Sequence, residues 1–311
     1  MALFLITGGA GFIGSTIART LASRGDRVRV LDTLLTGRAE NLADLPDVEL
    51  RVGDIRDSET LANAMAGVDV VLHQAALPSV ARSLRDPIAS DETNVGGTLK
   101  VLVAARDAGV KRVVCASSSS VYGDTPTLPK VETMMPGPLS PYAVSKLTGE
   151  YYCAVFTRLF GVEAVALRYF NVFGPRQDPK SEYAAVIPLF ATAMMRGEAP
   201  SVHGDGTQSR DFTFVDNVVQ ANLRAAEASG VGGEVFNVAC GERFTLLELI
   251  AQVNRILGTS IEPVFVDSRR GDVKHSLADI DKARRLLGYE PRVTFAEGLE
   301  RTVAWLKTQN R

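Results

Sequence analysis

The chain has 311 residues, of which 46% are hydrophobic and 23% charged, and its formal net charge is −2. This composition is ordinary for a globular protein of one large domain or two closely associated ones. It provides no basic surface for nucleic acid, and no run of apolar residues is long enough to cross a membrane. Three separated cysteines without a C-x-x-C pair predict reduced thiols and a cytoplasmic protein, and the three histidines lack metal-ligand spacing, so no metal is expected.

The first motif in the chain has three glycines, Gly8, Gly11 and Gly14, after an apolar run and at the start of a helix-like stretch at residues 12–23. Glycine lets the backbone turn tightly and approach a pyrophosphate, and a helix that begins there offers unpaired N–H groups. The next strand-like run ends in Asp32, eighteen residues after Gly14, where a carboxylate can bind an adenosine ribose. We therefore predict a dinucleotide site. The alternative is a glycine-rich turn without a ligand, and Asp32 argues against it.

Further apolar, strand-like runs alternate with helical patterns, at residues 48–52, 69–72, 112–116 and 164–168. This alternation predicts a parallel sheet that helices cover on both faces. The predicted fold class is α/β: a doubly wound parallel sheet of the Rossmann type with a second, smaller α/β substrate domain.

The regular alternation stops after Phe170, and residues 211–215 look like a return to the sheet. We therefore assign residues 1–170 and 211–240 to the dinucleotide-binding domain, and residues 171–210 and 241–311 to the second domain.

Two long helical patterns, at residues 92–108 and 142–160, lie on either side of a serine-rich turn. Such a pair often packs against a second copy of the chain, so we expect a homodimer; burial within one subunit is the alternative.

Tyr142 and Lys146 are four residues apart, so a helix places the phenol and the ammonium on one face. Residues 117–120 are four serines at the carboxyl end of the run at 112–116, where open α/β sheets bind ligands. Lowering the pKa of a phenol from about 10 to about 7 costs about 4 kcal/mol. An ammonium at about 4.5 Å supplies about 3.7 kcal/mol at an effective dielectric constant of about 20.

We therefore predict Tyr142 as a general base, Lys146 as its electrostatic partner and one of the serines as a relay to the substrate hydroxyl. The alternatives are a half-buried aromatic side chain and a solvated loop.

With these residues the chain resembles the extended short-chain dehydrogenase/reductase family, and within it the UDP-sugar 4-epimerases. The matching motifs are Thr7–Gly14, Gly53–Ile55, His73–Ala76, Ser117–Gly123, Ser140–Lys146 and Arg168–Gly174. The resemblance implies NAD as cofactor and Tyr142, Lys146 and Ser118 as catalytic residues. The residues expected to bind NAD, from the glycine turn and from the resemblance, are Gly8, Gly11, Phe12, Ile13, Gly14, Asp32, Asp54, Ile55, Ala75, Ala76, Lys146 and Tyr169.

The resemblance also implies a UDP-sugar site, which makes the second domain a nucleotide-sugar-binding domain. Its expected residues are Ser79, Ser118, Ser119, Tyr142, Asn171, Gln177, Val186, His203, Arg210, Arg269 and Ser276. Asn171 would hold the diphosphate, Arg210 and Arg269 would clamp it, and the base would lie over the turn at His203. Taken without the family, Asn171 reads as a turn former, the arginines as surface charges and the turn as a plain β-turn.

Relatives that dehydrate or decarboxylate sugar nucleotides carry an acid just after the position of Ser118, where this chain has Ser119 and Ser120. We therefore expect an isomerase: Tyr142 takes the O4 proton, NAD⁺ takes the C4 hydride, and the 4-keto sugar rotates before the hydride returns to its other face. The alternatives are an oxidoreductase or dehydratase of the same family and a non-catalytic sensor that binds a dinucleotide.

NAD is favoured over NADP because Asp32 would repel a 2′-phosphate, although Arg38 could soften this repulsion. Hexose-restricted relatives carry a tyrosine where this chain has Ser276, so the small side chain favours UDP-GlcNAc and UDP-GalNAc over UDP-Glc and UDP-Gal. Pro78 departs from the pattern of the N-acetylhexosamine branch.

Overall fold

The computed structural model describes residues 2–179, 185–267 and 274–309. The strands are β1 (Leu3–Thr7), β2 (Arg27–Asp32), β3 (Val48–Val52), β4 (Val70–His73), β5 (Arg112–Ser118), β6 (Glu163–Tyr169), β7 (Val172–Phe173), β8 (Ser201–His203), β9 (Ser209–Arg210), β10 (Thr213–Phe214), β11 (Val235–Val238), β12 (Phe244–Thr245) and β13 (Val264–Val266). The α-helices are α1 (Phe12–Ser23), α2 (Ser58–Met65), α3 (Val80–Arg85), α4 (Pro87–Asp91), α5 (Gly97–Asp107), α6 (Pro141–Phe160), α7 (Val186–Met195), α8 (Val215–Glu227), α9 (Leu246–Leu257), α10 (Asp281–Leu287) and α11 (Phe295–Gln309). Short 3₁₀ turns lie at η1 (Ala39–Leu42) and η3 (Ser119–Tyr122), and a π-helical turn, η2 (Glu92–Gly96), precedes α5. Each of these helices is too short or too polar to span a membrane.

A seven-stranded sheet carries the first part of the chain, in the order β11-β6-β5-β4-β1-β2-β3, with every pair parallel. The strand order reverses between β1 and β4. In open α/β sheets ligands bind beyond the carboxyl ends of the strands at such a point. The predicted doubly wound α/β fold is confirmed, and its topology places the ligand cleft next to Gly8 and Gln74, which follow β1 and β4.

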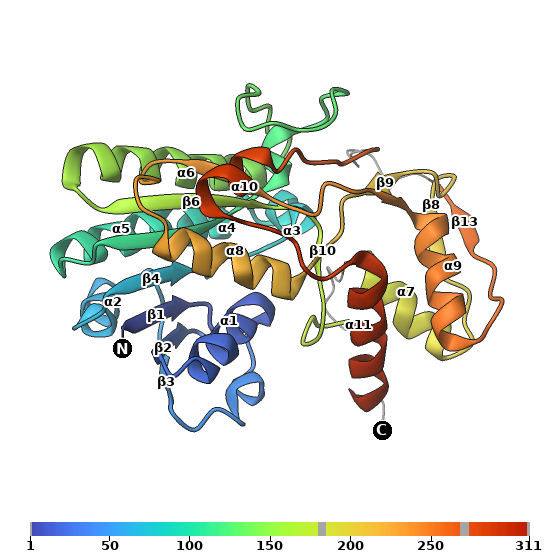
Figure 1. Ribbon diagram of the computed structural model, residues 1–311, viewed down its shortest axis with the longest axis horizontal. Coiled ribbons are helices and arrows are strands. Elements are labelled where there is room, and N and C mark those ends of the chain that lie inside the picture. The colour runs from blue at the N-terminus through green and yellow to red at the C-terminus, as the bar shows by residue number, and fades with distance from the viewer. Residues whose placement is uncertain (1, 180–184, 268–273, 310–311) are drawn as a thin grey trace.

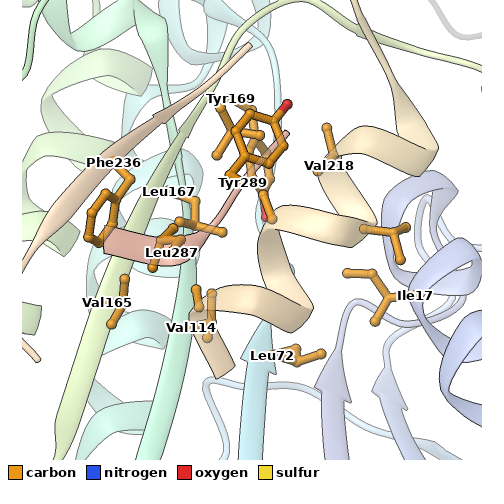
Figure 2. Packing of buried hydrophobic residues seen from close by; sticks show 14 of the residues in the cluster. Ile17, Leu72, Val114, Val165, Leu167, Tyr169, Val218, Phe236, Leu287 and Tyr289 are labelled. Carbon is orange, nitrogen blue, oxygen red and sulfur yellow. The ribbon is translucent and has the colours of Figure 1, made fainter. Parts of the chain in front are cut away.

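Helices cover both faces of this sheet (Figure 1). On one face, Ile17 of α1, Val218 of α8 and Leu287 of α10 belong to one buried cluster with the strand residues Leu72 and Val114 (Figure 2). On the other face, α2, α5 and α6 form a second cluster with the strands. Burial on both faces explains why the strands read as continuous apolar runs.

A second region lies beside the carboxyl edge of the sheet, at the right of Figure 1. It contains α7, α9, α11 and three two-stranded sheets, in which β10 pairs with β7, β12 with β9 and β13 with β8. Aromatic rings fill its core: the ring of Phe295 stacks on Phe212 and Phe244, at centroid distances of 5.3 and 4.3 Å. Thr245 and Glu248 form a capping box that starts α9, and Gly258 ends this helix in the left-handed conformation.

The structure corrects one expectation about the chain path. Residues 211–215 do not return to the main sheet, because β10 pairs with β7 and Phe214 packs in the aromatic core of the second region. The return is made by β11, which pairs with β6. The division of the chain into one domain of residues 1–170 and 211–240 and a second of residues 171–210 and 241–311 stays a prediction. Helix α10, which this division assigns to the second domain, packs on the sheet of the first.

Candidate active site and cofactor cleft

A cleft of about 810 Å³ lies beyond the carboxyl ends of β1 and β4, where the topology places it. It brings together all the residues expected to bind the cofactor, from the glycine turn to the far side of the sheet. These lining residues are Gly8, Gly11, Phe12, Ile13, Gly14, Asp32, Asp54, Ile55, Ala75, Ala76, Lys146 and Tyr169.

The glycine turn leaves no room for side chains. A Cβ on Gly8 would lie 2.7 Å from the backbone of Ala75, and one on Gly14 would collide with the carbonyl oxygen of Gly8. Gly11 is the N-cap of α1 and supplies no side chain to bond the first N–H groups of that helix. The turn and helix end therefore offer backbone donors and a positive dipole end to an anion, as a pyrophosphate requires.

Asp32 fixes the backbone at the end of the cleft where the adenosine is expected. Its Oδ2 accepts the N–H of Ala10 at 3.0 Å, and its Oδ1 accepts the N–H of Leu34 at 2.8 Å. Asp54, on the neighbouring strand connection, pairs with Arg56 at 2.7 Å, and this ion pair lowers the pKa of Asp54. The carboxylates at this end are thus fixed by bonds to their surroundings and fit the ribose and adenine of a dinucleotide.

Tyr142 and Lys146 enter the cleft from the first turns of α6. Ser140 caps this helix by accepting the N–H of Ala143 at 3.1 Å, and Pro141 occupies its first turn. The Lys146 Nζ donates to the carbonyl oxygen of Ala116 at 2.9 Å and lies 5.9 Å from the centroid of the Tyr142 ring. This hydrogen bond joins β5, which ends in the serines, to α6, which carries Tyr142.

Ser118 acts on the Tyr142 phenol as a hydrogen-bond donor would, in the direction that lowers the pKa of Tyr142 and favours the phenolate. The Ser120 hydroxyl and backbone N–H both donate to the Ser118 Oγ, at 2.9 and 3.2 Å. With its oxygen engaged by Ser120, Ser118 has its own proton to donate toward the phenol.

The electrostatic expectation for the phenol is wrong for the protein without its cofactor. Burial raises the pKa of Tyr142, and the hydrogen bond from Ser118 opposes only part of this. Burial also lowers the pKa of Lys146, to about 8. The predicted effect of the ammonium was too large because both groups lose solvation. The Lys146 Nζ also donates to the carbonyl oxygen of Ala116 and lies 5.9 Å from the ring centroid of Tyr142.

A polar network behind the cleft was missed by sequence reasoning. His73 bonds the Thr7 Oγ1 through Nδ1 at 2.6 Å and the Thr98 Oγ1 through Nε2 at 2.9 Å. The Thr98 hydroxyl donates to the carbonyl oxygen of Asn94, in the π-helical turn η2, and burial lowers the pKa of His73 to about 3. His73 is thus a neutral side chain that joins β1, β4 and α5 directly under the cleft.

A buried ion pair was also missed. Arg168 binds Glu150 through Nε and Nη2 at 2.8 and 2.7 Å, and the Ser117 hydroxyl donates to the same carboxylate at 2.5 Å. Glu150 is four residues beyond Lys146, so helical spacing could have placed it on the face of α6 that carries Tyr142 and Lys146. Its partner comes from β6, and no local pattern indicates that contact.

The residues expected to bind the substrate are only partly brought together. Ser79, Tyr142 and Gln177 line the cleft, whereas Ser118, Ser119, Asn171, Val186, His203, Arg210 and Ser276 do not. Arg269 lies outside the described residues. Ser118 lies next to Tyr142, which lines the cleft.

Asn171 has a positive φ of 34° and donates from Nδ2 to the carbonyl oxygen of Asp211 at 3.1 Å, so it acts at least as a turn residue. Arg210 on β9 donates to the carbonyl oxygen of Lys274 at 3.0 Å, and the neighbouring Ser209 carbonyl accepts the N–H of Ser276 at 3.0 Å. Arg210 and Ser276 thus lie on adjoining segments.

The carboxylate of Asp211 ties these segments to the sheet. It accepts the backbone N–H groups of Cys240, Gly241 and Ala278, at 2.9, 3.1 and 3.2 Å. His203 ends β8, and its Nδ1 lies 2.8 Å from the carbonyl oxygen of Asp267.

Comparison with known proteins agrees with this geometry. Residues 4–239 match the NAD dependent epimerase/dehydratase family. The chain belongs to this family. It is 41% identical to a UDP-glucose 4-epimerase of Mycolicibacterium smegmatis, over 99% of each chain.

Solved structures with the same fold include a UDP-glucose 4-epimerase from Thermotoga maritima with UDP-glucose, which has a TM-score of 0.95 and 38% identity and covers 99% of this chain and 100% of its own. A UDP-N-acetylglucosamine 4-epimerase from Methanobrevibacter ruminantium M1, in complex with UDP-N-acetylmuramic acid, has a TM-score of 0.95 and 39% identity over 99% of each chain. The predictions of an NAD-dependent enzyme and of an isomerase similar to UDP-sugar 4-epimerases are confirmed.

Proposed function

We propose that this enzyme inverts C4 of a UDP-hexose through a transient 4-keto sugar, with Tyr142 as the base. The observation that carries this proposal is that Tyr142 and Lys146 line the cleft that the glycine turn opens, with Ser118 next to the Tyr142 phenol. The rest of the predicted NAD site lines the same cleft, so a sugar beside the phenol would also lie beside the cofactor.

The chain's own groups hold and move one proton. The phenolate oxygen of Tyr142 accepts the proton of the sugar O4 hydroxyl, and Ser118 donates a hydrogen bond that stabilises the phenolate. When bound, NAD⁺ supplies a hydride acceptor for C4 and a positive charge beside the phenol. Burial raises the pKa of Tyr142 in the protein alone, and the positive charge of the bound cofactor would act in the opposite direction.

Inversion requires that the oxidised sugar rotate while its diphosphate stays anchored. We propose Arg210 and Asn171 as the anchor, with Arg269 as the second guanidinium that the family pattern implies. A guanidinium binds phosphate oxygens through two parallel hydrogen bonds, which fixes the diphosphate and leaves the sugar ring free to turn.

We propose UDP-GlcNAc and UDP-GalNAc as the favoured substrates, with UDP-Glc and UDP-Gal accepted more weakly. Ser276, which is buried, supports this preference because its side chain is small at the position where the hexose-restricted relatives carry a tyrosine. The change Ser276→Tyr should reduce kcat/KM for UDP-GlcNAc far more than for UDP-Glc; an equal loss on both contradicts this role.

The deciding experiment incubates the purified enzyme separately with UDP-GlcNAc and UDP-Glc and resolves the C4 epimers by chromatography. Conversion of at least one substrate is expected, without net NADH in the absorbance at 340 nm. An oxidoreductase would accumulate NADH, a dehydratase would release a 4-keto-6-deoxy sugar, and a sensor would convert nothing.

We also propose a homodimer. The most exposed apolar side chains of α6 are Tyr151 and Leu159, at 60% and 66%. Helices α3 and α4, which pack against α6, expose Leu84 and Ile88 at 65% and 70%. A second copy of this face would cover them. Light scattering should give twice the chain mass, and Leu159→Glu should shift it toward the monomer; a monomeric wild type contradicts the proposal.

We place the enzyme in the cytoplasm as a further proposal, since Cys115 and Cys153 are free buried thiols. Fractionation of cells that express the enzyme tests this.

A further inference from the structure

The adenosine end of the cleft contains two arginines, and each has a carboxylate partner. Arg56 pairs with Asp54, two residues before it in the chain, at 2.7 Å. Arg38 pairs with Asp178, 140 residues further along, with 2.6 Å between Nη2 and Oδ2. Both Arg38 and Asp178 line the cleft, so this second pair joins the loop after β2 to the loop after β7 at the cleft wall.

The backbone of Arg38 is fixed beside the carboxylate that would bind the ribose. Its N–H donates to the carbonyl oxygen of Ala10 in the glycine turn at 3.0 Å. The preceding residue, Gly37, lies so close to Asp32 that a Cβ there would come within 2.8 Å of both carboxylate oxygens. An arginine near the ribose-binding acid is the side chain with which this class of site accommodates the 2′-phosphate of NADP. Arg38 therefore has the place of an NADP-binding residue in a protein that uses NAD.

We infer that Asp178 is a second determinant of the preference for NAD over NADP, acting together with Asp32. It holds the guanidinium of Arg38 in an ion pair and so withholds that guanidinium from a 2′-phosphate. This end of the cleft is lined by three carboxylates, on Asp32, Asp54 and Asp178, and by the two guanidinium groups of Arg38 and Arg56. The inference rests on the proposed placement of the adenosine ribose at Asp32.

The size of the effect follows from exposure. The side chains of Arg38 and Asp178 are 58% and 34% exposed, so their attraction is partly screened by water and by salt. Releasing Arg38 should therefore raise the affinity for NADP⁺ relative to NAD⁺ by about fivefold at low ionic strength, and by less in 0.5 M salt.

The test is a competition between the two nucleotides. The purified enzyme is incubated with equal concentrations of NAD⁺ and NADP⁺ until the bound ratio is constant, and the bound nucleotides are separated from the protein and quantified by chromatography. Asp178→Asn should shift the ratio about fivefold toward NADP⁺. The double variant Arg38→Ala/Asp178→Asn should lose this shift, because the gain comes from the released guanidinium.

The matched control is Glu300→Gln, which breaks the pair of Arg255 and Glu300 at 3.0 Å, with side chains 58% and 52% exposed and away from the cleft. It should leave the ratio unchanged. An unchanged ratio in Asp178→Asn, or an equal shift when Arg38 is absent, overturns the inference. Asp32→Asn distinguishes a failure of the proposed ribose placement from a failure of the role of Asp178. If neither Asp32→Asn nor Asp178→Asn changes the bound ratio, the ribose placement is wrong. If Asp32→Asn shifts the ratio and Asp178→Asn does not, only the role of Asp178 is wrong.

Discussion

The two sides of the cleft are built differently. On the cofactor side, a seven-stranded sheet presents a backbone turn and a helix end, and the glycines contribute by having no side chain. On the proposed substrate side, the two-residue strand β9 carries Arg210. It pairs with β12, in which Phe244 lies opposite Arg210, and the Arg210 guanidinium donates to the carbonyl oxygen of Lys274, 64 residues away. The cofactor site therefore depends on local backbone geometry, whereas the proposed substrate site depends on contacts between segments far apart in the chain.

The largest effect is expected at Tyr142, which extends from the cofactor side toward the sugar. Tyr142→Phe removes the only atom that can accept the O4 proton in the proposed reaction, so kcat should fall by about 10²–10⁴-fold. NAD binding should be nearly unchanged, because the turn and Asp32 are untouched. Turnover is followed by chromatography of the epimers and bound NAD by its absorbance after denaturation; activity like that of the wild type would disprove the base assignment.

The next prediction concerns the glycine turn on the cofactor side and its effect on NAD affinity. In Gly14→Ala the new Cβ would meet the carbonyl oxygen of Gly8, so the turn must shift and NAD binding should weaken by about tenfold or more. Gly96→Ala is the matched control, since a Cβ there meets nothing within 4 Å. NAD affinity is measured by calorimetric titration. Equal affinities for the two variants would show that the turn does not hold the cofactor.

A smaller effect is expected at Arg210, on the proposed substrate side. Arg210→Ala should raise KM for the UDP-sugar by about tenfold, the value of one charge-assisted hydrogen bond, with less change in kcat and none in NAD affinity. Arg255→Ala removes a guanidinium of the second region that does not line the cleft, and should change neither constant. A fall in kcat at constant KM would place Arg210 outside the diphosphate anchor.

The same difference explains what could be predicted from the sequence. The helix at residues 12–23 and the acid at Asp32 follow from local periodicity and spacing, and the structure places both as expected. The return strand was misplaced because residues 211–215 are as apolar as a sheet strand, while their position depends on Phe173 and Phe295 packing around Phe214. The pairing of Glu150 with Arg168 and of Arg38 with Asp178 joins distant segments, which no spacing rule indicates.

The smallest effect concerns the stability of the cofactor side. Burial lowers the pKa of Lys146 to about 8, below its unfolded value of 10.5, so folding opposes the charged form. Below pH 8 both states carry the proton, and the folded state bears the full cost of the buried charge. As the pH rises from 8 to 10.5 the folded protein releases its proton first, and the stability of the protein increases.

Lys146→Met should therefore raise the melting temperature by a few degrees at pH 7, and the advantage should shrink as the pH approaches 10.5. Lys111→Met, at an exposed lysine, should show neither effect. Scanning calorimetry from pH 7 to 10.5 measures both. A destabilised Lys146→Met at pH 7 would mean that the bond from Nζ to the Ala116 carbonyl outweighs the lost solvation, and that the ammonium stabilises the cofactor side as well as serving its chemistry.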